Sequence, residues 1–234
     1  MAALIEIIGN DYCGTLGTDG YRVYISYRDG RPAEVDLASC MAHIRRKFEP
    51  VLDPPETKAA QEAALVIRLI GKLYNLEREL RDARAGPALR EAARAHRAAP
   101  IIARLEKIFR VLLPRHRPQS PMGKALSYAL SRWSDLRAYV TDGRVELDNN
   151  LVENDIRPLK LGAKNSLFIG SAKAGHLYAA GYTLVENAER QGLDVRTYLI
   201  ETIKAVIAHG PRIAAQLTPM RKAAHPQDHR RIAA

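Results

Sequence analysis

The sequence predicts a mainly helical α/β fold, in which a few short strands come before a long helical block. Three observations support this prediction. Short segments with alternating apolar residues and turn signals occupy the first 40 positions. From residue 42 to about residue 139, apolar residues recur at three- and four-residue steps. A segment rich in carboxylates and amides then opens another helix near residue 150.

Composition limits the classes of protein that fit. Of the 234 residues, 47% are hydrophobic, so a sizeable core is expected and global disorder is excluded. The net charge of +10 favours nucleic acid, an anionic membrane or an acidic partner. Cys13 and Cys40 have no neighbouring cysteine, which excludes a zinc-ligand spacing. Because there is neither a signal peptide nor an apolar run of about 18 residues, we expect a reduced cytoplasmic protein without a membrane span.

The first 41 residues contain the predicted strands. Residues 1–8 are apolar and form the end of a helix or a strand. Residues 15–20 predict a short strand that runs into a turn, and residues 28–32 predict a second turn. Residues 33–39 alternate in polarity and predict a second strand. Two isolated strands are only marginally stable in water, so these residues must pack on other elements.

Apolar stripes define the helices of the long block. The first stripe consists of Val66, Leu69, Ile70, Leu73, Leu76 and Leu80, and the second of Ile101, Ile102, Leu105, Ile108, Phe109 and Leu112. Pro100 fits the start of the second helix, and Pro114 ends it. Ser120 and Pro121 predict a capped start for the next helix. We expect Trp133, Tyr128 and Phe168 to pack in the core rather than stack on bases.

Arginines also recur at helical spacing in this block, at positions 78, 81, 84, 90, 94 and 97. Such a row is usually a solvated helix face. Its excess over the nearby acids supports contact with a DNA backbone about equally well. His43, beside two arginines, is interpreted as structural or phosphate-contacting rather than as a metal ligand.

After the block, Asp142 and Gly143 predict a turn, and residues 145–147 predict a short strand. A helix is expected to start at Asn150 and to end near Pro158, followed by an irregular segment over residues 159–171. Helices over residues 175–190 and after Asp194 come next. From about residue 219 onward we expect loose chain.

The stretch from residue 148 to residue 158 is the most polar of the chain. It contains three carboxylates, three amides and an arginine, a set of ligands that suits a hard cation such as Mg²⁺. Simpler roles compete with metal binding. Glu153 has the capping-box spacing from Asn150, Asp148 fits a turn, and Asp155 fits a solvated acid in the first turn. Asp19 before Gly20 is, on the same grounds, a turn residue.

Five motifs occur in the order found in one family. They are Thr18-Asp19-Gly20-Tyr21, the segment from Cys40 to Phe48, Leu73-Tyr74-Asn75-Leu76-Glu77, Ser127-Tyr128 with Trp133, and Asp148-Asn149-Asn150 to Pro158 followed by residues 162–168. The chain resembles transposases of the insertion-sequence-66 family, members of the DDE class, and the resemblance covers about residues 14–198.

The resemblance implies a partial RNase H-like core with a large all-helical insertion. It makes Asp19 the second catalytic aspartate and Glu153 the closing glutamate. In the complete family enzyme these acids and a first aspartate hold two Mg²⁺ or Mn²⁺ ions. Nothing in the chain matches the first aspartate or its leading strands, and Asp11 is a poor substitute because it stands in a polar loop. We therefore expect the C-terminal part of a catalytic region that is inactive alone.

The expected domains follow from this assignment. They are partial RNase H-like strands with the second aspartate (1–41), the helical insertion (42–140), the catalytic-glutamate helix with the helices after it (141–218) and a flexible basic tail (219–234). The expected DNA-binding residues are Arg45, Arg46, Arg157, Lys160, Lys164 and Asn165.

The expected function is Mg²⁺-dependent cleavage and strand transfer at the ends of an insertion element. The expected partners are DNA, further copies of the chain in a transposition complex, and accessory transposition proteins, but no membrane. The alternative is a non-catalytic DNA-binding or inhibitory transposase fragment. A third interpretation is an unfolded relic of a transposase.

Overall fold

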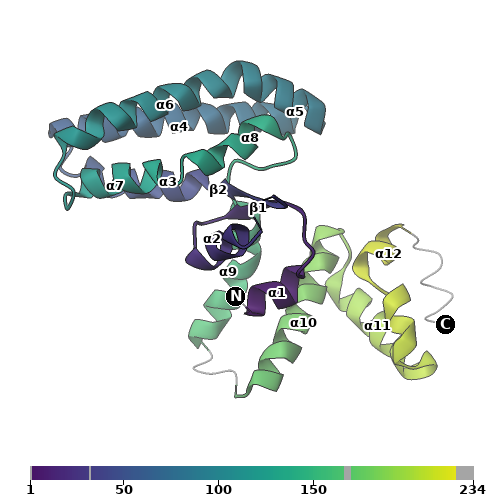
Figure 1. Ribbon diagram of the computed structural model, residues 1–234. Coiled ribbons are helices and arrows are strands. Elements are labelled where there is room, and N and C mark those ends of the chain that lie inside the picture. Colours follow the sequence, from purple (N-terminus) through teal and green to yellow (C-terminus); the bar gives the residue numbers. More distant parts are fainter. Residues whose placement is uncertain (1, 32, 166–169, 225–234) are drawn as a thin grey trace. The chain divides into compact units, whose positions relative to one another are not determined.

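The computed structural model describes residues 2–31, 33–165 and 170–224. Its chain forms two compact units, Met1–Leu151 and Val152–Ala234, and each is described by itself. The described residues are mainly helical, with one two-stranded parallel sheet (Figure 1). This confirms the mainly helical α/β prediction, whereas the RNase H-like core stays a prediction. No helix in the described part of the chain is long and apolar enough to cross a membrane.

The sheet forms near the start of the first unit. After α1 (Ala2–Ile8), β1 (Gly14–Thr18) pairs in parallel with β2 (Val35–Ser39), and Thr18 lies opposite Ser39. Both strands were predicted, but the helix between them, α2 (Arg22–Asp29), was not. Parallel strands need a crossover connection, and α2 provides it. The buried Tyr27 of α2 donates a hydrogen bond to the carbonyl of Gly9 at 2.8 Å, which ties α2 to the chain before β1.

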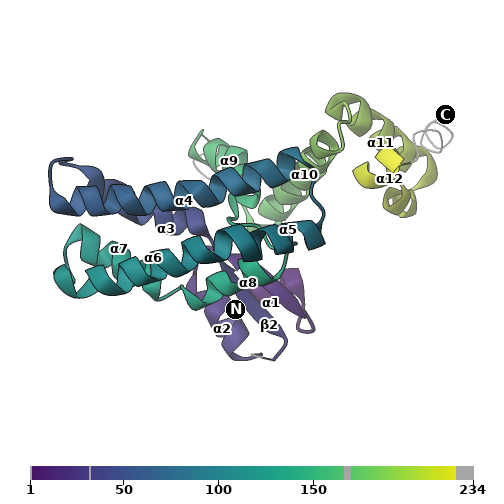
Figure 2. The ribbon, with the colours of Figure 1, turned by 90° about the horizontal axis from the view of Figure 1, so that it is seen from above.

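Four longer helices form the rest of the first unit: α3 (Met41–Phe48), α4 (Lys58–Asp82), α6 (Ala99–Leu112) and α7 (Pro121–Leu130). Figure 2 shows α4 and α6 running side by side, with α3 and α7 along them. Shorter helical segments lie between and after them: η1 (Glu49–Leu52), α5 (Pro87–Ala93), η2 (Arg94–Ala98), η3 (Leu113–Arg115), η4 (Ser134–Leu136) and α8 (Arg137–Thr141). The η2 turn is π-helical and continues directly into α6.

The predicted cap of α7 is present, and α4 has a cap that was not predicted. The Ser120 hydroxyl accepts a hydrogen bond from the Gly123 amide at 3.1 Å, and Pro121 occupies the first turn of α7. The Thr57 hydroxyl caps α4 in the same way, by accepting from the Ala60 amide. Each cap satisfies an amide that the helix itself leaves without an acceptor.

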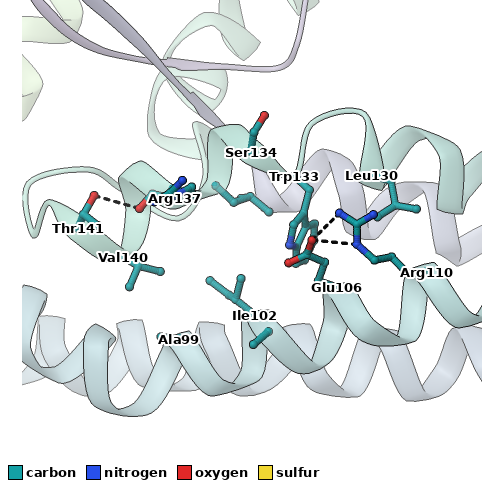
Figure 3. Close-up of a pocket in the computed structure, with 12 residues that line it drawn as sticks. Ala99, Ile102, Glu106, Arg110, Leu130, Trp133, Ser134, Arg137, Val140 and Thr141 are labelled. Atoms are coloured by element: carbon teal, nitrogen blue, oxygen red, sulfur yellow. Dashed lines mark hydrogen bonds and ion pairs between the residues drawn. The ribbon is translucent and has the colours of Figure 1, made fainter.

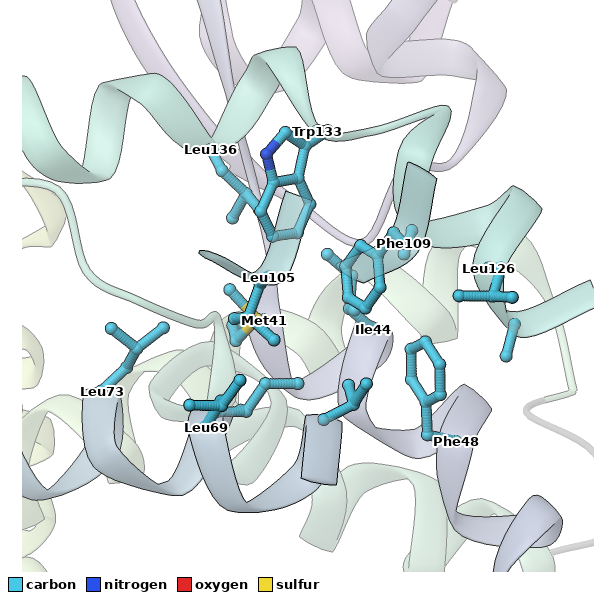
Figure 4. Packing of buried hydrophobic residues seen from close by; sticks show 14 of the residues in the cluster. Met41, Ile44, Phe48, Leu69, Leu73, Leu105, Phe109, Leu126, Trp133 and Leu136 are labelled. Carbon is cyan, nitrogen blue, oxygen red and sulfur yellow. The ribbon is translucent and has the colours of Figure 1, made fainter. Parts of the chain in front are cut away.

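The apolar stripes of the four helices meet in one core (Figure 4). Phe48 of α3 stacks on Phe109 of α6 with ring centres 5.4 Å apart. Trp133 packs edge-on against Phe109 at 5.1 Å, so its predicted core position is confirmed. The fully buried neighbours of these rings include Met41, Ile44, Ile70, Leu73, Leu105, Met122 and Leu126. Offset and edge-on ring pairs of this kind stabilise the core beyond the apolar area that they bury.

The second unit contains the later helices, and several predictions there were wrong. α9 (Asn150–Asn165) does not end near Pro158 but continues through it, so residues 159–165 are helical rather than irregular. α10 (Ala172–Arg190) begins three residues earlier than expected, because Ser171 caps it by accepting from the Ala174 amide. In the first unit, residues 145–147 form no strand, contrary to the prediction.

The end of the second unit is better ordered than predicted. α11 (Val195–His209) starts at the predicted Asp194 cap, whose carboxylate accepts from the Thr197 amide at 2.8 Å. After η5 (Pro211–Gln216), the chain forms α12 (Pro219–Ala224), where loose chain was expected. Tyr198 of α11 donates a hydrogen bond to the carbonyl of Leu217 at 2.9 Å, which holds the segment before α12 in place. The rest of the expected tail, residues 225–234, lies outside the described residues.

Candidate functional site

The carboxyl ends of β1 and β2 lie together, because parallel strands end at the same edge of a sheet. Asp19 directly follows β1, and Cys40 directly follows β2. The Cys40 amide donates to the carbonyl of Thr18 at 3.0 Å, which brings the two strand ends into contact. This edge of the sheet is therefore where the predicted acid Asp19 stands.

The side chain of Asp19 is exposed and shapes a tight turn. One of its carboxylate oxygens accepts from the Tyr21 amide at 2.9 Å. Gly20 has a φ of +82°, a left-handed conformation that glycine adopts without strain. The turn role expected for Asp19 is confirmed. In the described part of the chain, the Tyr21 amide is the only hydrogen-bond donor to this carboxylate, so acceptor capacity remains.

α7 and the residues after it hold this turn from outside. Tyr128 donates its hydroxyl hydrogen to the carbonyl of Asp19 at 3.2 Å, and Arg132 donates to the carbonyl of Gly20 at 3.3 Å. Burial raises the pKa of the Tyr128 hydroxyl. The prediction that Tyr128 packs in the core is confirmed in part: its ring is half-buried and packs against the core, and it also lies beneath the cationic groups of Lys47 and Arg132. Phe168, predicted with it, lies outside the described residues.

Asp148 lies near the end of β2, because the Met41 amide donates to the carbonyl of Leu147 at 3.0 Å. Its carboxylate accepts from the Tyr74 hydroxyl at 2.8 Å and from the Asn150 amide at 3.0 Å. Burial and the hydrogen bond to Asp148 raise the pKa of Tyr74. Burial also raises the pKa of the nearby Cys40 thiol. Asp148 thus joins α4 to the start of α9, and its predicted role as a turn residue is confirmed.

A buried arginine fixes the segment that leads into Asp148. Arg94 of η2 forms two parallel hydrogen bonds, both 2.8 Å long, to the buried carboxylate of Glu77. Its remaining nitrogen donates to the carbonyls of Tyr139, Asp142 and Val145, at 3.1, 3.1 and 2.7 Å. Gly143 allows this close packing, since any side chain there would collide with the backbone of Pro87. We refer to these contacts as the Arg94 clamp.

Glu77 is the charge partner at the centre of the clamp. It accepts from the Tyr139 hydroxyl at 2.7 Å and from Arg90 at 2.9 Å, in addition to Arg94. Burial alone would raise the pKa of Glu77, but the hydrogen bonds from Arg94, Tyr139 and Arg90 outweigh it and hold the pKa below its ordinary value. Arg90 also forms a bidentate pair with Glu146.

The arginine row therefore does not form one DNA-binding face. Arg94 is fully buried, and Arg90 is largely buried and paired with two carboxylates. Arg97 lies at the surface but pairs with Glu79 at 2.7 Å. The interpretation as a solvated face and the interpretation as a DNA contact both fail for Arg90 and Arg94, which are structural.

Arg45 and Arg46, which were predicted to bind DNA, lie on α3, directly after the carboxyl end of β2. Both are exposed. Arg45 pairs with Glu49 one turn along the chain at 3.4 Å, and Arg46 lies 3.4 Å from the half-buried ring of His43. Their place beside the strand ends is consistent with a basic rim around Asp19.

The predicted residues of α9 belong to the second unit. Glu153 is half-buried in the first turn of α9, and Arg157 is exposed. Asp155 is not the solvated acid that was expected, because it pairs with Arg190 of α10. The side chains of Lys160, Lys164 and Asn165 lie outside the described residues. Asp19 stands in one unit and Glu153 in the other, so a shared metal site stays a prediction.

Two cavities in the first unit are poor candidates for a metal site built from carboxylates. The larger, about 640 Å³, lies between α6 and residues 130–141, with Trp133 in its wall and Glu106 paired to Arg110 (Figure 3). The other, about 400 Å³, includes Arg28 and Asp135, which pair with each other. Neither is lined by Asp19. Within the described part of either unit, no three His, Cys, Asp or Glu side chains gather as metal ligands.

Comparison with known proteins decides the family. The sequence profile of the transposase IS66 family matches residues 2–177, a range that includes both Asp19 and Glu153. The chain belongs to the IS66 transposase family. No solved structure matches it.

Named relatives of this family member come from Sinorhizobium fredii. The uncharacterized protein y4jD is 32% identical over 199 residues, which cover 83% of this chain and 38% of the relative. The uncharacterized protein y4qI is 32% identical over 205 residues, which cover 86% of this chain and 37% of the relative. The chain thus spans less than two fifths of the length of these two relatives.

Proposed function

We propose that the chain is part of the catalytic region of a DDE-type transposase, which cleaves and joins DNA at the ends of an insertion element with Mg²⁺ or Mn²⁺. The observation that supports this proposal is Asp19. It is an exposed carboxylate with spare acceptor capacity, at the carboxyl end of a parallel strand, within the segment that matches the family. Glu153, in the same matched segment, is the second acid of the proposal.

The donor chemistry of these residues fits a divalent cation. Mg²⁺ is usually held by one or two carboxylates together with waters and phosphate oxygens. Asp19 and Glu153 would be the carboxylates, and Asp148 would not be, because its oxygens already accept from Tyr74 and Asn150. A pair of bound cations would stabilise the charge that develops on the attacking and leaving oxygens of a phosphodiester.

The protein's own contribution is to position its acids. The Tyr21 amide and the contacts from Tyr128 and Arg132 fix the turn that presents the carboxylate of Asp19. The Arg94 clamp fixes residues 139–147, the chain that leads into α9 and so to Glu153. Precise positioning of this kind accounts for a large part of catalysis in phosphoryl transfer.

The proposal assigns two of the three acids that the family chemistry uses. Among the described residues, no cluster of three His, Cys, Asp or Glu side chains supplies the third. We therefore expect these 234 residues alone to bind DNA and cations but to turn over poorly. Arg45, Arg46 and Arg157 are the proposed DNA contacts with described side chains, and Lys160, Lys164 and Asn165 complete the set. Assembly as a homo-oligomer on element ends, with accessory proteins, belongs to the same proposal.

Cation binding tests the proposal directly. Mn²⁺ affinity is measured by electron paramagnetic resonance for the full chain and for Asp19→Asn and Glu153→Gln. We expect each substitution to weaken binding at least about tenfold, since a ligating carboxylate becomes a neutral amide. Asp36→Asn, an exposed acid on β2, is the matched control and should bind Mn²⁺ as the unaltered chain does. Equal affinity in all four proteins would refute the proposal.

A second candidate function is a non-catalytic DNA-binding or inhibitory module. The net charge of +10 and the lack of a cluster of three acids among the described residues favour it. A nicking assay on DNA that carries element ends, with Mn²⁺ present, separates the two functions. Nicking that disappears in Glu153→Gln would exclude the module. Salt-sensitive DNA binding with no nicking, and with Mn²⁺ affinity indifferent to Asp19→Asn, would favour it.

A further inference from the structure

Lys47, Tyr128 and Arg132 form a group beside Asp19 whose cationic ends have no role in the proposed chemistry. The Arg132 guanidinium lies over the ring of Tyr128 at 3.9 Å from its centre, and the Lys47 ammonium lies over the same ring at 5.0 Å. The three residues come from α3, α7 and the turn after α7, and the packing of α3 against α7 brings them together. The hydroxyl of the same tyrosine bonds to the backbone of Asp19.

Among the described residues, neither Lys47 nor Arg132 forms a salt bridge. Of the acids near them, Glu49 pairs with Arg45 and Asp135 pairs with Arg28. Asp19, in the turn that Arg132 holds, accepts from the Tyr21 amide and forms no salt bridge with either cation in the described part of the chain. Two positive charges over one ring repel each other, and the attraction of the ring for each cation offsets that repulsion only in part. A bound anion that contacts both cations would offset this repulsion.

The donors of the two cations are also only partly used. Arg132 gives one hydrogen bond to Ser131 and one to Gly20, so each terminal nitrogen keeps a second N–H, whereas its Nε is buried against the turn. Lys47 is exposed, and its ammonium carries three donors. A phosphodiester oxygen is the acceptor that suits both an arginine fork and a lysine point charge.

The surrounding surface extends the positive charge along α7. Lys124 and Tyr128 are one helical turn apart on α7 and share a face, and Arg132 follows in the turn after the helix. Lys124, Ser127 and Ser131 on and near this face are exposed. Such a row of cations and hydroxyls is typical of a surface that follows a nucleic-acid backbone.

We propose that Lys47, Tyr128 and Arg132 form a binding site for a DNA backbone phosphate next to Asp19. This inference rests on the proposed function, because it identifies DNA as the partner of the same site. The ring orients the two cations, and Arg132 at the same time holds Gly20. Binding of the strand would thus be linked directly to the turn that presents the carboxylate.

Fluorescence anisotropy with a labelled 30-base-pair duplex, in EDTA and across a range of salt, tests the site. The test variant is Lys47→Gln/Arg132→Gln. The matched control is Arg104→Gln/Lys107→Gln, which removes the same two charges from an exposed face of α6. We expect the test variant to lose about tenfold or more in affinity and its salt slope to fall by about 1, since each phosphate contact contributes about one to that slope. The control should change less than about threefold.

Equal losses in the two double variants would overturn the site, because they would show only the effect of net charge. If Arg132→Gln proves to unfold the chain in a thermal melt, Lys47→Gln alone decides. It removes only an exposed cation, and an affinity unchanged from that of the starting chain would overturn the site.

Mn²⁺ affinity keeps this test apart from that of the proposed function. Lys47→Gln should bind Mn²⁺ as the unaltered chain does, because Lys47 does not hold the Asp19 turn. A loss of Mn²⁺ affinity in Lys47→Gln that parallels its loss of DNA affinity would overturn the site by showing that Lys47 acts only through Asp19. An unaltered chain that binds DNA through this site but binds no Mn²⁺ would support the site and refute the catalytic proposal.

Discussion

Replacement of Arg94 with methionine removes the centre of the Arg94 clamp while keeping most of the buried volume. The guanidinium is fully buried and gives two hydrogen bonds to Glu77 and three to backbone carbonyls. Methionine replaces the stem of the side chain, so the cavity that is left is small. The change therefore tests the charge and the hydrogen bonds more than the packing.

The expected loss follows from what Arg94 leaves behind. Breaking a buried ion pair by removing one partner costs about 3–5 kcal/mol, because the other charge stays buried. Glu77 keeps its bonds from Tyr139 and Arg90, so the lower end of that range applies. The carbonyl of Tyr139 loses a buried donor, which adds about 1 kcal/mol. We expect the free energy of unfolding of the first unit to fall by about 4 kcal/mol and its melting temperature by about 10 °C.

Urea unfolding of the full chain, followed by circular dichroism, measures this loss. Arg94→Lys should fall between the two proteins, since an ammonium keeps the charge but cannot form the bidentate pair. Arg97→Met is the control: its pair with Glu79 lies at the surface, so no measurable change is expected. If the free energy of unfolding of Arg94→Met lies within about 1 kcal/mol of that of the unaltered chain, at the same dependence on urea concentration, the clamp is refuted. A cooperative transition in the unaltered chain would also contradict an unfolded relic.

Three further predictions concern single groups of the first unit. Folding holds the pKa of Glu77 below its ordinary value of 4.5 despite burial, so the ionised carboxylate stabilises the fold above pH 4.5 and this stabilisation is lost as the pH falls through its lowered pKa. The free energy of unfolding of Glu77→Gln should therefore fall less steeply in acid than that of the unaltered chain. Parallel plots of unfolding free energy against pH would contradict this. Tyr74→Phe removes the hydroxyl bond to Asp148 and should lower the free energy of unfolding by about 1 kcal/mol, measured in urea, whereas an unchanged midpoint would show that water replaces it. Cys13 is exposed, while Cys40 is buried with a raised pKa, so Ellman's reagent should label one thiol quickly and the second only on unfolding; two fast thiols would disprove this burial.

The sequence predicted the helical block well because apolar periodicity is a local property. The stripes of α4 and α6, the Ser120 cap and the Asp194 cap each depend on residues within a few turns of one another. The turn at Asp19 is local too. The family motifs located this acid and Glu153, and the match over residues 2–177 confirms the family they indicated.

The missed elements have identifiable physical reasons. α2 contains Val23, Tyr24 and Ile25, residues that favour strands, and it forms a helix because β1 and β2 need a crossover. α9 continues through Pro158, although proline removes one backbone hydrogen bond, the one that Asn154 would accept. In both cases the surrounding structure overrides a local preference.

The sequence by itself determined the helices of the long block, where several of them begin and which family the chain belongs to. Only the tertiary structure decided what each charge does. Arg94 and Arg97 stand in the same row, yet one is buried against Glu77 and the other is exposed. Tyr128, expected in the core, is a half-buried ring that packs against the core and lies beneath two cations. These roles depend on partners that are far apart in the chain and that meet only when helices pack, which no local pattern encodes.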